Sequence, residues 1–215
     1  MKFTAIDLEL NQPDNKIIQI GAAEFDTDLK SGNITDRTFM RFIDRETNWE
    51  HVLNTGKTLR ELLPHSPEHF KEKGIKIDLG LREFRDWLDQ GATGKKIIQW
   101  GSGDFALILG EMKEHGLEFK RRYQCFNFKQ SYQFLIQPAF KLHKGGGLGS
   151  AINAMELEFY GKPHSAIYDA INTGLLFTEC FLRINKLYQI EKLFLRKEQR
   201  AELLPTDYYD KLRQN

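Results

Sequence analysis

The sequence predicts an α/β fold in which helices cover a mixed β-sheet. Three strand-like segments, rich in β-branched and aromatic residues, occupy the beginning of the chain. Helical spacing of apolar residues then alternates with a further short strand-like segment. A meander of strands followed by alternating helices and strands is typical of a mixed sheet flanked by helices. With 215 residues the chain is long enough for one sizeable core, so we expect one main domain.

The N-terminal strands are predicted at residues 2–10, 17–25 and 38–43. A Gln-Pro-Asp signal and a Ser-Gly-Asn signal mark the turns between them. Because these connections are short, we expect an antiparallel meander. Residues 49–80 show a weaker pattern, which is typical of a connecting region with short helical pieces.

The rest of the chain is predicted to be mainly helical. Apolar residues recur at helical spacing around residues 81–88. A short strand at residues 96–100 leads through a glycine-containing turn into an amphipathic helix at residues 104–115. Further helices are predicted at residues 148–158 and from residue 165 onward, past residue 188.

Composition excludes several classes of protein. Hydrophobic residues make up 40% and charged residues 28% of the chain, as in ordinary globular proteins. The two cysteines lie far apart without CxxC spacing, so neither a zinc site nor a disulfide framework is indicated. No apolar run is long enough to span a membrane and no signal peptide is evident, so we expect a cytoplasmic protein that does not bind membranes.

The charge balance is nearly neutral. Thirty-one basic residues face 30 acidic ones, so no general cationic surface indicates nucleic-acid binding. A polyanion would have to be held locally, by clusters at residues 120–122 and 141–144 or by Lys162. For each cluster, a solvated surface role is the more common alternative.

Two carboxylates stand two residues apart in the first predicted strand. Asp7 and Glu9 therefore point to the same face, since side chains alternate along a strand. An Asp-x-Glu pair is often ordinary surface alternation. Here the flanking residues are apolar on both faces, as in a central strand, where uncompensated carboxylates are costly. This placement favours a metal site.

Three further residues are weak signals when taken alone. Asp104 begins a predicted helix, where capping that helix is the simple alternative. His164 precedes another helix, and Asp169 lies in the first turns of that helix. The two side chains can therefore point at one site, His164 from the loop and Asp169 from the helix. The glycine run at residues 145–147 lacks the ending of a phosphate-binding P-loop and is interpreted as a turn, with a flexible substrate flap as the alternative.

Taken together, these blocks resemble the DEDDh exonucleases, a family of the ribonuclease H-like fold that includes proofreading exonucleases and ribonuclease T. The matching segments are IDLEL with KIIQIGAAEFD, then QWGSGDFALI, then GKPHSAIYDAINTG. The segments FNFK and FYGKPHSAIYDAIN look like those of the Eri-type subgroup, which trims RNA 3′ ends. The resemblance implies a mixed five-stranded sheet flanked by helices. We assign residues 1–185 to the exonuclease domain and residues 186–215 to a helical extension of unknown role.

The resemblance also implies an activity, which is metal-dependent 3′→5′ hydrolysis of the terminal phosphodiester of a nucleic acid with a free 3′ end. Asp7, Glu9, Asp104 and Asp169 would bind two Mg²⁺ or Mn²⁺ ions, with Asp7 bridging both. Oxygen-only ligands agree with these hard cations. His164 would be the general base that takes a proton from the attacking water. The products would be nucleoside monophosphates, with RNA slightly favoured over DNA.

The chain departs from the family pattern at four places. Leu10 and Asn11 stand where a Thr is usual, Gly103 replaces a frequent Phe, and Tyr168 replaces a frequent Asp. None of these changes removes a metal ligand. Three alternatives stay open. They are a DNA-directed proofreading or repair exonuclease, a catalytically silent nucleic-acid-binding or scaffold relative, and a scavenger of small nucleotides or oligonucleotides. Leu8 and Leu10 are candidates for packing around the terminal nucleotide, although a core role is the stronger alternative for both.

Overall fold

The computed structural model describes residues 1–27, 34–91, 95–142 and 146–194, with side chains described up to residue 187 except that of Ile34. The predicted turn at residues 31–33, part of the glycine run and residues 195–215 of the predicted extension lie outside this description. The chain forms two compact units, Met1–Thr178 and Glu179–Asn215. No helix of the described residues is long and apolar enough to cross a membrane.

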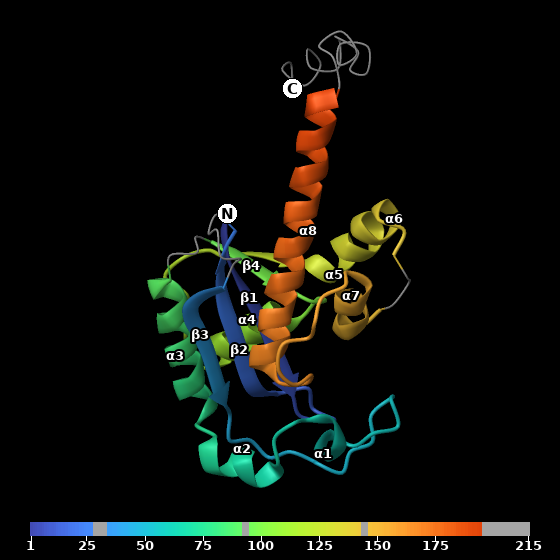
Figure 1. Ribbon diagram of the computed structural model, residues 1–215. Coiled ribbons are helices and arrows are strands. Elements are labelled where there is room, and N and C mark those ends of the chain that lie inside the picture. Colours follow the sequence, from blue (N-terminus) through green and yellow to red (C-terminus); the bar gives the residue numbers. More distant parts are fainter. Residues whose placement is uncertain (28–33, 92–94, 143–145, 195–215) are drawn as a thin grey trace. The chain divides into compact units, whose positions relative to one another are not determined.

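Five strands form one mixed sheet in the order β3-β2-β1-β4-β5. The strands are β1 (Lys2–Leu10), β2 (Ile17–Asp26), β3 (Ile34–Phe42), β4 (Lys96–Gln99) and β5 (Gln124–Asn127). The first three pair antiparallel, whereas β1–β4 and β4–β5 pair parallel. The predicted mixed five-stranded sheet is thereby confirmed, with β1 at its centre (Figure 1). Local periodicity had not singled out β5, which has only four residues.

The helices occupy most of the remaining described chain. They are α1 (Leu59–Leu62), α2 (Pro67–Lys73), α3 (Ile77–Gln90), α4 (Asp104–Glu114), α5 (Phe128–Ser131), a π-helix (Tyr132–Ile136), α6 (Gln137–Ala139), α7 (Leu148–Ala154) and α8 (Ala166–Phe194). The helix predicted at 148–158 ends earlier, at Ala154. Glu156 takes a positive φ of 59°, and the N–H of Leu157 donates to the carbonyl of Ile152, which closes the helix as in a Schellman motif.

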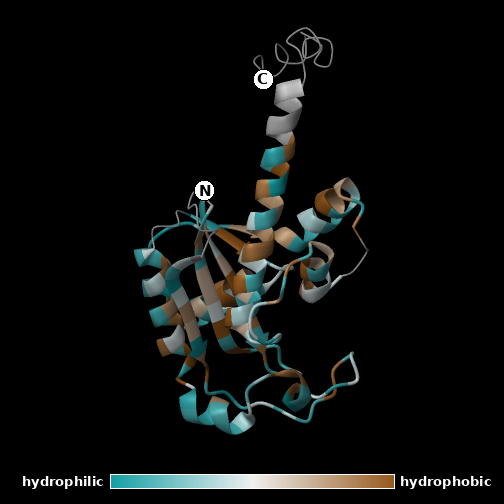
Figure 2. Ribbon diagram, in the orientation of Figure 1, coloured by the Kyte–Doolittle hydropathy of each residue, from teal (hydrophilic) through white to brown (hydrophobic). Residues whose placement is uncertain are grey.

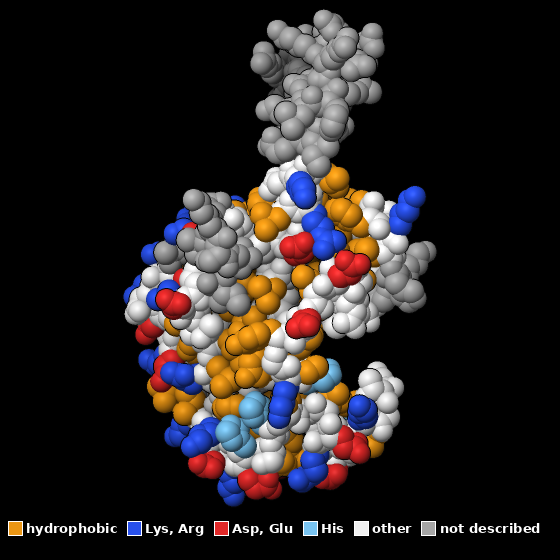
Figure 3. All heavy atoms as spheres, in the orientation of Figure 1, with side chains coloured by type: hydrophobic (Ala, Val, Ile, Leu, Met, Phe, Trp, Pro, Cys, Tyr) orange, Lys and Arg blue, Asp and Glu red, His pale blue; other side chains and the backbone are white. Residues whose placement is uncertain are grey.

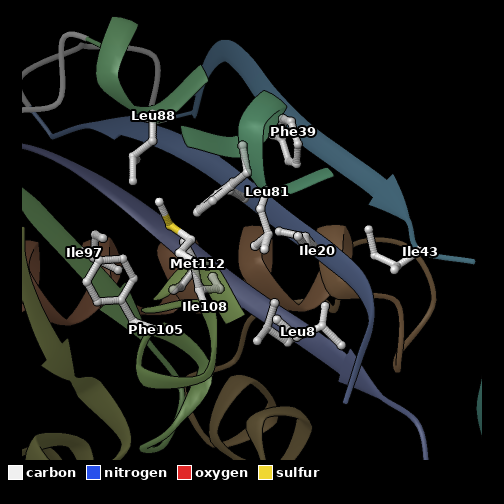
Figure 4. Packing of buried hydrophobic residues seen from close by; sticks show 14 of the residues in the cluster. Leu8, Ile20, Phe39, Ile43, Leu81, Leu88, Ile97, Phe105, Ile108 and Met112 are labelled. Atoms are coloured by element: carbon white, nitrogen blue, oxygen red, sulfur yellow. The ribbon is translucent and has the colours of Figure 1, made fainter. Parts of the chain in front are cut away.

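A hydrophobic core fills the face of the sheet covered by α3 and α4 (Figure 4). Ile6 and Leu8 of β1 enter this core together with Leu81, Phe84 and Leu88 of α3, Ile108 and Met112 of α4, and further buried residues of β2, β3 and β4. The opposite side of α3 carries polar residues, so hydrophilic and hydrophobic residues alternate along this helix (Figure 2). This amphipathic pattern is the reason that helical spacing in the sequence located α3 correctly.

The first part of α8 covers the other face of the sheet (Figure 1). Phe3 of β1 packs edge-on against Phe177 of α8, with ring centroids 4.9 Å apart. Phe3 also stacks on Phe25 of β2 at 5.0 Å. The two faces of β1 therefore have different partners, and the odd-numbered positions of this strand look toward α8.

Candidate metal centre

The centre of the site is the C-terminal half of β1. Side chains alternate along a strand, and Ile6 and Leu8 are committed to the core on the α3 side. Asp7 and Glu9 consequently lie on the α8 side, as their spacing predicted. Both are partly buried, because β1 is flanked by a strand on each edge.

Helix α8 adds the third carboxylate. Asp169 lies in its first turn. One carboxylate oxygen from each of Asp7, Glu9 and Asp169 lies within 4.8 Å of the other two. The fold thus brings together two acids of β1 and one acid that is far away in the sequence. Among the described residues this is the one group of acidic, His and Cys side chains with spacing suited to a metal ion.

Two residues of β2 seat the start of α8 against the sheet. Gln19, which is paired with Glu9, is fully buried, and its side-chain oxygen accepts a hydrogen bond of 2.8 Å from the N–H of Ala166. Gly21 is paired with Asp7, and a Cβ at this position would overlap the backbone of Ala166 and Ile167. An amide acceptor and a missing side chain therefore let α8 approach closely enough to deliver its carboxylate.

The turn between β4 and Asp104 is held by the side-chain amide of Gln99, the last residue of β4. The side chain of Gln99 donates to the carbonyl of Gly101 at 3.0 Å and accepts from the N–H of Phe105 at 3.0 Å. Gly103, with a φ of 137°, is the residue that caps α4, and Asp104 is the first helical residue. The simple alternative of Asp104 as the capping residue is therefore wrong. Its carboxylate acts electrostatically on Asp7 and Glu9, although it lies outside the group of three.

Burial raises the pKa of all four carboxyl groups, and the charges of neighbouring carboxylates raise those of Asp7 and Glu9 further. Burial, followed by the charges of Glu9, Asp104 and Asp169, raises the pKa of Asp7 well above its ordinary value. Burial and the charges of Asp169 and Asp104 do the same to the pKa of Glu9. Burial raises the pKa of Asp104 to about 6 and that of Asp169 to about 7. Such a cluster is unfavourable without a cation to compensate its charge.

His164 lies at the mouth of this group, with a left-handed φ of 61°. Its backbone N–H donates a 3.0 Å hydrogen bond to a carboxylate oxygen of Asp169. The ring makes no hydrogen bond or ion pair within the described part of the chain. Partial burial, and then the positive charge of Lys57, lowers the pKa of His164, so the ring is neutral at physiological pH.

The loop that leads to His164 is anchored by Asn172, which is buried in α8. Its amide accepts from the N–H of Tyr160 at 2.8 Å and donates to the carbonyls of Tyr160 at 2.8 Å and Tyr168 at 2.7 Å. The ring of Tyr168 packs edge-on against that of Tyr160, at 5.8 Å, and lies over Gly161. Tyr168 therefore packs within this loop, whereas the His164 side chain is exposed.

The candidate nucleotide-packing residues have different surroundings. Leu8 belongs to the buried core on the α3 side, so the core alternative holds for it. Leu10 is partly buried and packs against the edge of the same core. Histidine side chains gather near α1 and α2 on the face shown in Figure 3, where the rings of His65 and His69 stack at 4.9 Å. The charge of Lys162 acts on His65, so cations border this region.

Gln19 and Gly21 are the supporting residues that the sequence prediction missed. Both stand in the segment KIIQIGAAEFD, on β2, where Gln19 pairs with Glu9 and Gly21 with Asp7 of β1. A polar residue within this otherwise apolar strand was the available signal for Gln19. Its partner Ala166 lies 147 residues away, and local pattern carries no information about such a contact.

The donor set fits hard divalent cations. It consists of carboxylate oxygens only, and their spacing suits one shared ion. Burial, and then the negative charge of neighbouring carboxylates, raises the pKa values of Asp7 and Glu9. Mg²⁺ and Mn²⁺ prefer such ligands, whereas zinc sites commonly include His or Cys. Both cysteines are free, and Cys180 is buried within α8.

No protein-family model and no curated protein matches the chain. Solved structures do match. The nuclease domain of 3′hExo, a DEDDh family member bound to rAMP, has a TM-score of 0.61 and 17% identity over 85% of this chain and 92% of that chain. S. pombe Pop2p, in a form with Mg²⁺ and Mn²⁺ bound, has a TM-score of 0.56 and 19% identity over 84% and 83%. E. coli exonuclease I with a dT13 oligonucleotide has a TM-score of 0.63 and 11% identity over 94% and 45%.

The chain spans only part of some of these proteins. It covers 60% of a full-length 3′-exonuclease, which it matches with a TM-score of 0.61 at 16% identity. At these identities the likeness concerns the fold, and it agrees with the fold that the DEDDh resemblance predicted. The chain therefore has the fold of these solved 3′-exonuclease structures.

Proposed function

We propose that the protein is a metal-dependent 3′→5′ exonuclease that releases nucleoside monophosphates from nucleic acid, with RNA slightly favoured. The observation that carries this proposal is the convergence of Asp7, Glu9 and Asp169 within 4.8 Å, with Asp104 close enough to act on their charge. The shared fold with 3′-exonucleases agrees with it. Asp7, Glu9, Asp104 and Asp169 would hold two Mg²⁺ or Mn²⁺ ions.

When bound, such ions lower the pKa of a coordinated water and neutralise charge on the phosphate and the leaving oxygen. The protein's own part is positional. Gln19 and Gly21 keep Asp169 beside the two acids of β1, and the backbone N–H of His164 fixes the orientation of the Asp169 carboxylate. These contacts hold the oxygen ligands ready before substrate arrives.

His164 is proposed as the general base. Its lowered pKa keeps the imidazole neutral at pH 7, so a ring nitrogen can accept a proton from the attacking water. Its exposed position at the mouth of the site permits the ring to reach a bound substrate. With its left-handed backbone, His164 directs its N–H toward the carboxylate of Asp169. This hydrogen bond connects the proposed base to one of the proposed metal ligands.

The test uses 5′-labelled single-stranded RNA and DNA of equal length, each with a 3′-hydroxyl or a 3′-phosphate. With Mg²⁺ we expect a ladder that shortens one nucleotide at a time from the free 3′ end, faster on RNA. EDTA and Asp104→Asn should each abolish it. Asp36→Asn is the matched control, because this exposed acid lies on β3, at the far edge of the sheet.

Several outcomes would contradict the proposal. Undiminished cleavage in excess EDTA would exclude the metal requirement, and early internal fragments would exclude exonuclease polarity. Faster digestion of DNA than of RNA would favour the DNA-directed alternative. Binding of the oligonucleotides without any cleavage, with Mg²⁺ or with Mn²⁺, would indicate the catalytically silent relative.

A further inference from the structure

A cavity of about 730 Å³ lies along α4, outside the group of carboxylates. Its wall comes from α4 and from the segment that connects α4 to β5. The lining residues that matter for its chemistry are Lys113, Phe119, Lys120, Arg121, Arg122 and Tyr123. The sequence suggested the cluster at residues 120–122 as a candidate phosphate contact. In the structure this cluster lines the cavity.

The cavity is strongly cationic for a nearly neutral protein. Four basic residues line it, and Glu118 is the single acidic residue among the lining residues. The basic residues are Lys113, Lys120, Arg121 and Arg122. The whole chain has a net charge of only +1, so this balance is local. Within the described chain, none of the four cations forms an ion pair. Unpaired cations around a hollow favour an anionic ligand.

A buried carboxylate of α3 fixes the backbone that presents these cations. Asp89 is 6% exposed, and its two oxygens accept from the N–H of Lys120 at 3.1 Å and from the hydroxyl of Tyr123 at 2.8 Å. Both hydrogen bonds hold the connecting segment rather than its charged side chains. The ammonium and guanidinium groups at residues 120–122 remain exposed on a pre-organised support.

Aromatic rings line the same hollow. Phe119 stacks on Phe105 with centroids 5.7 Å apart and meets Tyr123 edge-on at 5.2 Å. Phe119 and Tyr123 are each partly exposed, so their rings form part of the cavity wall. Aromatic rings beside unpaired cations are the combination by which proteins bind single-stranded nucleic acid, with bases on rings and phosphates on cations.

We infer that this cavity is a second binding site for single-stranded nucleic acid, separate from the carboxylates. The inference deepens the proposed exonuclease function and rests on it. Asp104 is the first residue of α4, and Lys113 follows nine residues later, about 14 Å along the helix axis. A substrate that uses both places has to be long enough to reach from the carboxylates, where its 3′ end would bind, to the cavity.

A binding measurement tests the site directly. The anisotropy of a labelled 20-nucleotide single-stranded RNA is followed in EDTA, where no cleavage occurs. Arg121→Gln with Arg122→Gln should weaken binding about tenfold and lower the slope of log K against log salt by about 1.4, because two phosphate contacts are lost. The matched control is Lys76→Gln with Arg82→Gln, which removes two exposed cations at α3 and should change neither quantity.

The rings and the class of ligand are tested separately. Phe119→Leu keeps an apolar side chain but removes the stacking surface, so binding should weaken about tenfold. A poly-glutamate peptide of equal charge should compete poorly with the RNA. Equal competition, or full RNA affinity in Phe119→Leu, would mean that the cavity recognises charge alone and would overturn the inference.

Turnover of two substrates separates this inference from the proposed function. The Arg121, Arg122 double variant should raise KM for the 20-nucleotide RNA about tenfold and leave hydrolysis of a dinucleotide unchanged, because a dinucleotide is too short to reach the cavity. Equal KM values in the variant and the wild type would overturn the second site while leaving the exonuclease intact. If the wild type hydrolysed neither substrate but bound the RNA through the cavity, the proposed function alone would fail.

Discussion

At the scale of single residues, the choice of general base is the sharpest question. His164 has a free ring, whereas Tyr168 is packed over Gly161 and against Tyr160. We expect His164→Ala to lower turnover about 10²- to 10⁴-fold, which is the usual contribution of general-base help. Tyr168→Phe keeps the packed ring and should stay active. Turnover and Mn²⁺ affinity are measured for both variants.

Metal affinity is the control in that comparison. It should be unchanged in His164→Ala, since the His164 ring is not an expected ligand. An active His164→Ala together with an inactive Tyr168→Phe would show that the base has been assigned to the wrong residue.

The carboxylate cluster should destabilise the metal-free protein. Burial and three neighbouring charges disfavour the ionised form of Asp7, so Asp7→Asn removes a strained charge while it keeps the shape of the side chain. We expect the variant to be inactive and its metal-free form to unfold about 2–4 °C higher, equivalent to about 1 kcal/mol in a protein of this size. Thermal unfolding in EDTA measures this.

Addition of Mg²⁺ provides the internal check. The wild type should gain stability from the ion by mass action, and Asp7→Asn should gain much less. A variant that unfolds at a lower temperature than the wild type in EDTA would contradict the view that repulsion dominates this site.

At the scale of elements, the junction between β2 and α8 organises the site. Gln19→Met keeps the volume of the side chain but removes the acceptor for the N–H of Ala166. Loss of a helix-capping interaction costs about 1 kcal/mol. Mn²⁺ affinity should fall about tenfold, as is typical when support around metal ligands is removed. Calorimetry and chemical unfolding measure the two effects.

Gln90→Met is the matched control, because Gln90 is exposed at the end of α3. It should alter neither quantity. If Gln19→Met lowered stability but left Mn²⁺ affinity at the wild-type value, Gln19 would be a purely structural residue with no effect on Asp169.

A second junction ties α4 to the chain after β3. Arg45 binds both carboxylate oxygens of Glu111, at 2.7 and 3.1 Å. Burial acts to raise the pKa of Glu111, but the hydrogen bonds and charge of Arg45, with Lys16 and His115, outweigh it and lower the pKa. The ion pair therefore stabilises the protein above the unfolded pKa of about 4.3, and this stability is lost as pH falls through the folded pKa.

Glu111→Gln should consequently cost about 3 kcal/mol at pH 7, because it leaves the Arg45 charge half-buried and without its partner. The difference from the wild type should shrink below pH 4. Urea unfolding at pH 7 and pH 3.5 measures it, and a difference that does not change with pH would exclude the ion pair as the cause.

At the scale of the whole molecule, the sequence predicted the helices and strands better than the contacts that hold them together. Alternation placed Asp7 and Glu9 on one face of a central strand, and helical spacing located α3, α4 and α8. Strand β5 was harder to see because four residues carry little periodicity. Asp89 could not be predicted as the anchor of residues 120–123, because its partners are 31 and 34 residues away. Such contacts depend on how the elements meet in space.

The long sequence separation between Gln19 and Ala166 also has a consequence for the synthesis of the protein. Asp7 and Glu9 leave the ribosome early, but α8 lies 147 residues beyond the strand that receives it. A nascent chain therefore holds Asp7, Glu9 and Asp104 but lacks Asp169 until α8 has begun to be translated. If the protein is the exonuclease proposed above, a nascent chain that lacks α8 should be unable to degrade its own messenger. For the exonuclease proposed above, the late position of α8 would delay activity until most of the preceding chain has been made.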